Sequence, residues 1–235
     1  MKALILNSGR GSRMGNETKE HPKCMTHLEG EDTILSRQLE QLKKMGIRDV
    51  IITTGYYNDM LEEYGRSISG DMNITYVFND QYSETNYIYS IYVAKQYLQD
   101  DIIFMHGDLV FEDRVLSEVL EHKDSCMVVD STLPLPEKDF KAVVNGGIIT
   151  KVGIEFFDDA VAAQPLYKLK QEGWIVWLNQ IVAFCESGQV NCYAENALNE
   201  VSQNCNITPY DVKGMLCGEI DTMEDREYIL QRIAE

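Results

Sequence analysis

The chain has 235 residues and a formal net charge of −17, and it is 44% hydrophobic and 25% charged. This composition is typical of a globular protein rather than a disordered or fibrous one, and the length suffices for a substantial core. The acidic balance argues against a broad nucleic-acid or membrane surface, because either surface needs a basic face to meet phosphates.

The apolar segments and the cysteines indicate the compartment in which the protein works. No apolar run approaches the roughly 20 residues that span a bilayer, and the opening stretch MKALILNSG is too short an apolar segment for a signal peptide. The 6 cysteines are scattered without a CxxC pair, so free, mostly buried thiols are expected rather than a zinc site or disulfides. We therefore expect a cytoplasmic protein.

Buried strands and amphipathic helices alternate along the first half of the chain. The apolar segment 2–7 predicts a first strand, and the spacing in TILSRQLEQLKKMG predicts a helix capped by Asp32 or Thr33 and stopped at Gly46. Further strands are expected at 49–56, 74–79 and 101–108, and further helices around 58–66 and 86–98. Such alternation implies a parallel sheet covered by helices on both faces.

The second half of the chain is less regular. Shorter strands are expected between residues 124 and 185, the last of them in IVAFC (181–185), and they contribute to a lid-like substrate region over about 124–200. Helix returns at 189–204, and a strand in MLCGEID precedes a C-terminal helix. We predict a single α/β domain over residues 1–235, with a Rossmann-like, mostly parallel sheet, helices on both faces and a small insertion.

A glycine-rich, basic stretch, LNSGRGSRMGNETKEHPKC, follows the first strand. Its glycines let backbone N–H groups approach an anion, while Arg13 offers a planar fork and Lys23 a movable point charge. The Walker pattern is absent, and the spacing GxGxxxG differs from the dinucleotide pattern GxGxxG. The alternative is a surface turn with solvated charges, but GxGSR behind a first strand, followed ten residues later by Lys23, favours a phosphate-binding loop.

Two motifs carry a resemblance to a known family. The N-terminal strand, GxGxR and the later Pro-Lys resemble the signature of nucleotidyltransferases that act on sugar phosphates and phosphocholine. The stretch VFNDQYSETNYIYSIYVAKQYL (77–98) is similar to one in bacterial CTP:phosphocholine cytidylyltransferases and their phosphonate-using relatives. The similarity covers residues 1 to about 110 and resumes at GEIDTMEDREYI. It implies a nucleotidyltransferase fold of the GT-A-like type.

The resemblance implies that the protein condenses CTP with a small phosphate or phosphonate monoester and releases pyrophosphate. It gives Lys23 and Arg13 a catalytic role on the phosphates, which fits a reaction driven mainly by positioning and charge neutralisation. The residues that it implies in nucleotide binding lie in the glycine loop, at strand ends and at the tyrosine-rich helix: Asn7, Ser8, Gly9, Arg10, Gly11, Ser12, Gly55, Tyr56, Asn79, Thr85, Asn86 and Ser90.

Two aspartates are expected to hold a metal. By resemblance, Asp108 in DIIFMHGD and Asp221 in GEIDT match the family's metal ligands, and Mg²⁺ prefers one or two carboxylates together with substrate phosphates and water. Asp108 is otherwise interpreted as a turn residue, and Asp221 as a helix-start residue beside Thr222 as the cap. The matching positions favour Mg²⁺ as the cofactor.

The second substrate is expected near NCYAENAL, where Tyr193 and Glu195 are the implied contacts and Glu195 pairs with a primary ammonium. Ala194 stands where the phosphocholine enzymes carry an aromatic residue. A quaternary ammonium calls for aromatic faces, so this alanine favours 2-aminoethylphosphonate over phosphocholine. Trp174 and Trp177 are alternative aromatics, interpreted first as core residues.

Two alternative functions remain open on the sequence alone. A sugar-1-phosphate nucleotidyltransferase usually carries a Gln-Leu-Gly-Thr-like segment where this chain has SETNYIYS. A non-catalytic nucleotide-binding protein on the same fold could dispense with the aspartate pair. His106 is interpreted as structural. The expected partners are CTP and a phosphate or phosphonate monoester, without nucleic acid or membrane, and homo-oligomerisation is left open.

Overall fold

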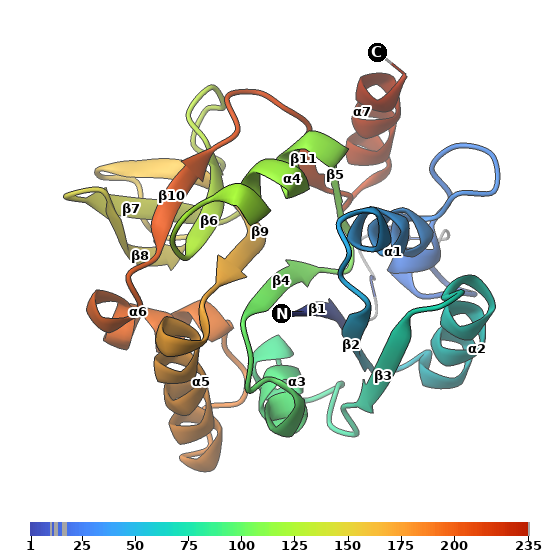
Figure 1. The fold of residues 1–235 in the computed structure, drawn as a ribbon, viewed down its shortest axis with the longest axis horizontal. Helices are drawn as coiled ribbons and strands as arrows, with labels where there is room; N and C mark the ends of the chain where they lie inside the picture. The colour runs from blue at the N-terminus through green and yellow to red at the C-terminus, as the bar shows by residue number, and fades with distance from the viewer. Residues whose placement is uncertain (10, 12–13, 16–17, 235) are drawn as a thin grey trace.

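A nine-stranded sheet forms the centre of the fold (Figure 1). The computed structural model describes residues 1–9, 11, 14–15 and 18–234. The strand order is β10-β6-β9-β4-β1-β2-β3, with a hairpin of β7 and β8 attached to β9, while β5 and β11 form a separate two-stranded sheet. The strands are β1 (Lys2–Asn7), β2 (Asp49–Thr54), β3 (Asn73–Phe78), β4 (Ile102–His106), β5 (Leu109–Phe111), β6 (Cys126–Asp130), β7 (Lys141–Asn145), β8 (Ile148–Gly153), β9 (Ala160–Leu169), β10 (Thr208–Asp211) and β11 (Cys217–Glu219).

Strand β1 shows why both faces of the sheet are covered. Successive side chains of a strand point to opposite faces. Ala3 and Ile5 pack in one apolar cluster, with α1 (Ile34–Lys44), α2 (Asn58–Ile68) and α4 (Asp113–Glu121). Leu4 and Leu6 pack in the other cluster, with α3 (Tyr87–Ala94), α5 (Gln171–Glu186) and α6 (Ala194–Cys205). The predicted α/β class, with helices on both faces, is confirmed (Figure 1).

The parallel direction of four strands places the loops that follow them at one edge of the sheet. Strands β3, β2, β1 and β4 pair in parallel, so their carboxyl ends meet at the same edge, where α/β proteins bind ligands. The sheet changes direction at β9, which pairs antiparallel with both β4 and β6. This ten-residue strand lies in the less regular region and was not predicted from the sequence.

The strand expected in 181–185 is wrong, because this segment belongs to α5. Trp174, Trp177, Leu178 and Ile181 are all buried. Their spacing of three, one and three residues is that of one helical face. An apolar run of five residues does not by itself distinguish a buried strand from part of a buried helix, and the wider spacing decides in favour of helix.

Helix α1 begins and ends as its sequence predicts. The Thr33 side chain accepts a hydrogen bond from the backbone N–H of Ser36 in a capping box, and the chain leaves the helix at Gly46, which has a φ of 79°. The cysteines are also free, and all except Cys192 are buried, as expected. Within the described residues, no helix combines the length and apolarity needed to cross a membrane.

Pairing between β5 and β11 brings the end of the chain to the sheet edge. The two strands are antiparallel, with Glu219 opposite Leu109, and the backbone N–H of Ile220 donates to the carbonyl of Asp108 at 3.0 Å. Thr222 caps the following helix, α7 (Met223–Ile233), through a capping box. Residues more than 100 positions apart in the sequence therefore lie side by side at this edge.

Candidate active site

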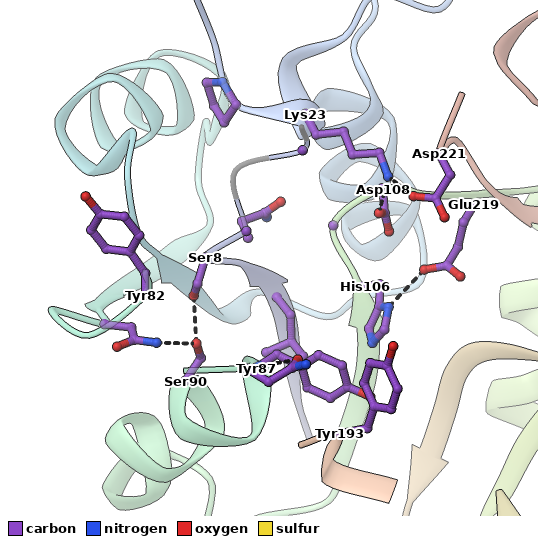
Figure 2. A pocket seen from close by; sticks show the side chains of 18 of the residues that line it. Ser8, Lys23, Tyr82, Tyr87, Ser90, His106, Asp108, Tyr193, Glu219 and Asp221 are labelled. Carbon is purple, nitrogen blue, oxygen red and sulfur yellow. Dashed lines mark hydrogen bonds and ion pairs between the residues drawn. The ribbon is translucent and has the colours of Figure 1, made fainter. Parts of the chain in front are cut away.

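A cavity of about 450 Å³ opens at the carboxyl edge of the parallel strands (Figure 2). It extends from the loop after β1 to the segment that precedes β7. Most of the site residues expected from the sequence line it: Asn7, Ser8, Gly9, Gly11, Lys23, Asn79, Thr85, Asn86, Ser90, Asp108, Tyr193 and Asp221. Arg10, Ser12 and Arg13 lie outside the described residues.

Lys23 joins the two aspartates that were expected to bind a metal. Its Nζ donates to Oδ2 of Asp108 at 2.6 Å and also to Oδ1 of Asp221 (Figure 2). The three side chains are only 12%, 20% and 15% exposed, respectively. Burial alone lowers the pKa of Lys23, but the two carboxylates outweigh burial and raise this pKa above its usual value. Lys23 is thus a charged ammonium in the lining of the cavity.

A hydrogen-bonded pair of titratable side chains lies beside this ion pair. Nδ1 of His106 is 2.9 Å from Oε1 of Glu219. Burial and the neighbouring Asp108 charge raise the pKa of Glu219 to about 7. Burial opposes the charged form of His106, but Glu219 outweighs it and raises the histidine pKa.

Glu219 was not predicted as a site residue and His106 was predicted to be structural, yet both line the cavity. His106 lies two residues before Asp108, and Glu219 lies two residues before Asp221. Alternate residues of an extended segment share a face. The two-residue spacing from Asp108 and Asp221 could therefore have indicated that His106 and Glu219 also face the site.

The carboxylates suit a divalent cation. Oδ1 of Asp108 is buried without a hydrogen-bond donor among the described residues. One atom each of His106, Asp108 and Glu219 lies within 4.8 Å of the others, and Asp221 shares the Lys23 ammonium with Asp108. Carboxylate oxygens gathered beside an open cavity are the ligands that Mg²⁺ prefers, so this site fits the expected cofactor.

Polar side chains tie the loop after β1 to the start of α3. Nδ2 of Asn79 donates to Oγ of Ser90 at 3.0 Å and to Oγ1 of Thr85 at 3.2 Å. The Ser90 hydroxyl donates to Oγ of Ser8 at 2.9 Å (Figure 2). Buried polar groups that satisfy one another in this way hold a fixed geometry. This end of the cavity is therefore preorganised.

Two expected nucleotide contacts do not line the cavity. A Cβ at Gly55 would lie 2.3 Å from the Ser8 carbonyl oxygen, so glycine permits a close backbone approach at this position. Tyr56 is 53% exposed, and its ring packs edge-on against Tyr82, with 6.1 Å between centroids. Tyr82 itself lines the cavity and was not predicted. Gly55 and Tyr56 thus support the wall from behind.

Aromatic rings line the opposite end of the cavity. Tyr193 lies 5.8 Å from Tyr87 and 5.1 Å from Phe140 between ring centroids, and Tyr87 lies 4.9 Å from His106. We call the part of the cavity lined by Tyr87, Phe140, Tyr193 and the Glu219 carboxyl group the aromatic chamber. Phe140 was not predicted, because its neighbours here come from distant parts of the sequence.

Glu195 does not reach the cavity, which corrects the expected substrate contact. Its side chain is 1% exposed, and its carboxylate accepts hydrogen bonds from the hydroxyls of Tyr87 and Tyr167. It therefore orients Tyr87 from behind. Ala194 is fully buried, and its carbonyl accepts from Nε1 of Trp177 at 2.9 Å. The core interpretation of Trp174 and Trp177 is confirmed by their complete burial, and the size of residue 194 no longer argues for a particular substrate.

Comparison with known proteins defines the class. Residues 3–134 match the MobA-like NTP transferase domain, so the chain belongs to this family, and its expected identity as a nucleotidyltransferase is confirmed. The CTP:phosphocholine cytidylyltransferase from Streptococcus pneumoniae has the same fold, with a TM-score of 0.77 at 20% identity over 100% of this chain and 99% of that chain.

Similar relatives confirm the resemblance to cytidylyltransferases. CTP:phosphoglutamine cytidylyltransferase of Campylobacter jejuni is 27% identical over 99% of this chain and 100% of its own length. Choline-phosphate cytidylyltransferase of Streptococcus pneumoniae is 24% identical over 96% and 95%. CMP-5'-(3-aminopropyl)phosphonate synthase of Streptomyces rubellomurinus is 30% identical over 56% of this chain, which spans only 21% of that protein.

Proposed function

We propose that the protein is a Mg²⁺-dependent cytidylyltransferase that joins CTP to a small phosphate or phosphonate monoester with a cationic head group. The observation that carries this proposal is the position of Lys23 between Asp108 and Asp221, where all three side chains line one cavity. One end of that cavity is the glycine loop and the other is the aromatic chamber. A nucleotide and an acceptor can therefore approach the same cation from opposite sides.

The reaction brings two anions together. An acceptor phosphoryl oxygen attacks the α-phosphorus of CTP, the bond to the β-phosphate breaks, and pyrophosphate leaves with the electron pair. Lys23 neutralises negative charge on the reacting oxygens. Asp108 and Asp221 would hold Mg²⁺, which when bound supplies a further positive charge to the phosphates.

The aromatic chamber supports an ammonium-bearing acceptor. The faces of Tyr87, Phe140 and Tyr193 attract cations, and Glu219 offers a carboxylate beside them. The names of the relatives include phosphoglutamine, an aminopropylphosphonate and choline phosphate, and each of these carries an amino or ammonium group. Since Ala194 no longer separates them, 2-aminoethylphosphonate and phosphocholine are both first candidates. A sugar phosphate, which carries no cation, is less well supported.

Pyrophosphate release in a grid of nucleotides and acceptors tests this proposal. CTP and UTP are each combined with phosphocholine, 2-aminoethylphosphonate and glucose 1-phosphate, with and without Mg²⁺. We expect release to require CTP, Mg²⁺ and an amine-bearing acceptor, and to disappear in the Asp108→Asn control. Preference for glucose 1-phosphate would instead support the sugar enzyme. Nucleotide binding without release for any acceptor would support the non-catalytic alternative.

A further inference from the structure

Two surface segments deliver residues to the acceptor end of the cavity. Residues 131–140, between β6 and β7, bring Lys138, Asp139 and Phe140 to the lining, and the turn after β8 brings Ile154. Phe140 in turn packs against Tyr193. Because neither segment belongs to a regular element at these positions, the shape of this end depends on whatever fixes them.

Lys141, the first residue of β7, lies at the junction of the two segments. Its side chain is fully buried. Its Nζ donates to the backbone carbonyls of Pro136 and of Asp139, the latter at 3.1 Å. The same Nζ lies 4.3 Å from the centroid of the Phe157 ring, in the turn after β8. One ammonium thus joins both segments.

The chemistry of lysine suits this junction. An ammonium has three donor hydrogens, so it can satisfy two carbonyls and still face an aromatic ring. The carboxylates of Asp139 and Glu155, which belong to the same two segments, act on this ammonium by their charge, although burial outweighs them and lowers the pKa of Lys141. Burying an amine is costly, and the hydrogen bonds and ring contact of this one all go to the segments that carry the lining. An apolar side chain at this position would leave the Pro136 and Asp139 carbonyls without their donor.

We propose that Lys141 is a positioning residue for the acceptor. It fixes residues 136–139, and with them the neighbouring Phe140 ring, in the geometry that the acceptor head group requires. The assignment of this end to the acceptor rests on the proposed function. The nucleotide end has its own network through Ser8, Asn79 and Ser90. Loss of Lys141 should therefore raise the KM for the acceptor and leave the KM for CTP nearly unchanged.

The test compares Lys141→Met with Lys151→Met. Lys151 is an exposed residue of the adjoining β8 whose Nζ lies 5.7 Å from the Phe156 ring, so it is a matched lysine outside the lining. In Lys141→Met we expect faster amide hydrogen exchange over residues 131–140 and a rise of about tenfold in the KM for the acceptor. The KM for CTP should stay within about twofold. Lys151→Met should change neither.

Two controls keep the outcome interpretable. If Lys141→Met lacks a cooperative unfolding transition, Phe157→Leu replaces it. The Phe157 ring is 50% exposed, and its loss removes only one contact of the ammonium. For this variant we expect faster exchange over residues 131–140 and a rise of about threefold in the acceptor KM. Unchanged exchange over 131–140, or an equal rise in both KM values, would overturn the positioning role. Hydrogen exchange needs no substrate, so a wild-type protein inactive with all acceptors would refute the proposed function while the exchange result still decides the role of Lys141.

Discussion

Replacing Lys23 with Met should destabilise the protein and stop turnover for one shared reason. The substitution leaves Asp108 and Asp221 facing each other without the ammonium that both now contact. Removing one partner of a fully buried ion pair costs about 3–5 kcal/mol. Because these carboxylates keep 20% and 15% of their exposure, we expect about 2–3 kcal/mol. For a chain of this length, that free energy corresponds to a fall in Tm of roughly 5–10 °C.

Calorimetry in EDTA and in Mg²⁺ measures this effect directly. Mg²⁺ should restore more of the Tm in Lys23→Met than it adds to the wild type, since the cation no longer competes with the ammonium for the same oxygens. Pyrophosphate release should fall by at least about 100-fold even with Mg²⁺ present, as expected when a charge that stabilises the transition state is lost.

A matched control is Lys44→Met. Lys44 also bridges two carboxylates, those of Glu40 and Asp113, but it is 50% exposed. Exposed ion pairs contribute little to stability, so we expect no measurable change in Tm or turnover. A Lys23→Met protein with the Tm and turnover of the wild type would show that the ammonium contributes neither to stability nor to catalysis.

Three further predictions concern the same cavity. Asp108→Asn should weaken Mn²⁺ binding by at least about tenfold in a titration without nucleotide, and unchanged affinity would place the metal elsewhere. Glu219→Gln should flatten the pH dependence of Tm in metal-free protein. The carboxyl of Glu219 keeps its proton up to a pKa of about 7 in the folded protein, whereas the ordinary glutamate pKa is 4.5. The wild type therefore loses stability as pH rises from 4.5 to about 7. Equal slopes from pH 4.5 to about 7 would contradict that explanation. Tyr193→Ala should raise the acceptor KM by about tenfold with the CTP KM unchanged, whereas Tyr228→Ala, at an exposed residue of α7, should change neither.

The sequence predicted most accurately what depends on local pattern. The strands and helices up to residue 98 follow from apolar spacing, and Thr33 and Gly46 delimit α1 as expected. Asp108 and Asp221 were paired by resemblance, and the antiparallel pairing of β5 with β11 now provides the physical reason for their proximity.

The errors arise where distant segments meet. The apolar run at 181–185 has no local feature that excludes a strand, and only its packing in α5 decides. Glu195 looked like a free carboxylate because the two tyrosines that hold it come from α3 and β9. Phe140 lines the cavity beside Tyr193, which is distant in the sequence but lies 5.1 Å away between ring centroids. Tertiary contacts of this kind leave no periodic signal in the sequence.

In the proposed reaction, this cavity joins a cytidylyl group to an amine-bearing phosphate or phosphonate. Phosphorus NMR of the wild-type protein with Mg²⁺, CTP and either phosphocholine or 2-aminoethylphosphonate detects the product of this reaction itself. We expect resonances of a CMP-linked product, with an equal amount of pyrophosphate, for at least one of the two acceptors. Intact CTP in both mixtures, with the protein shown to be folded, would contradict the proposed reaction.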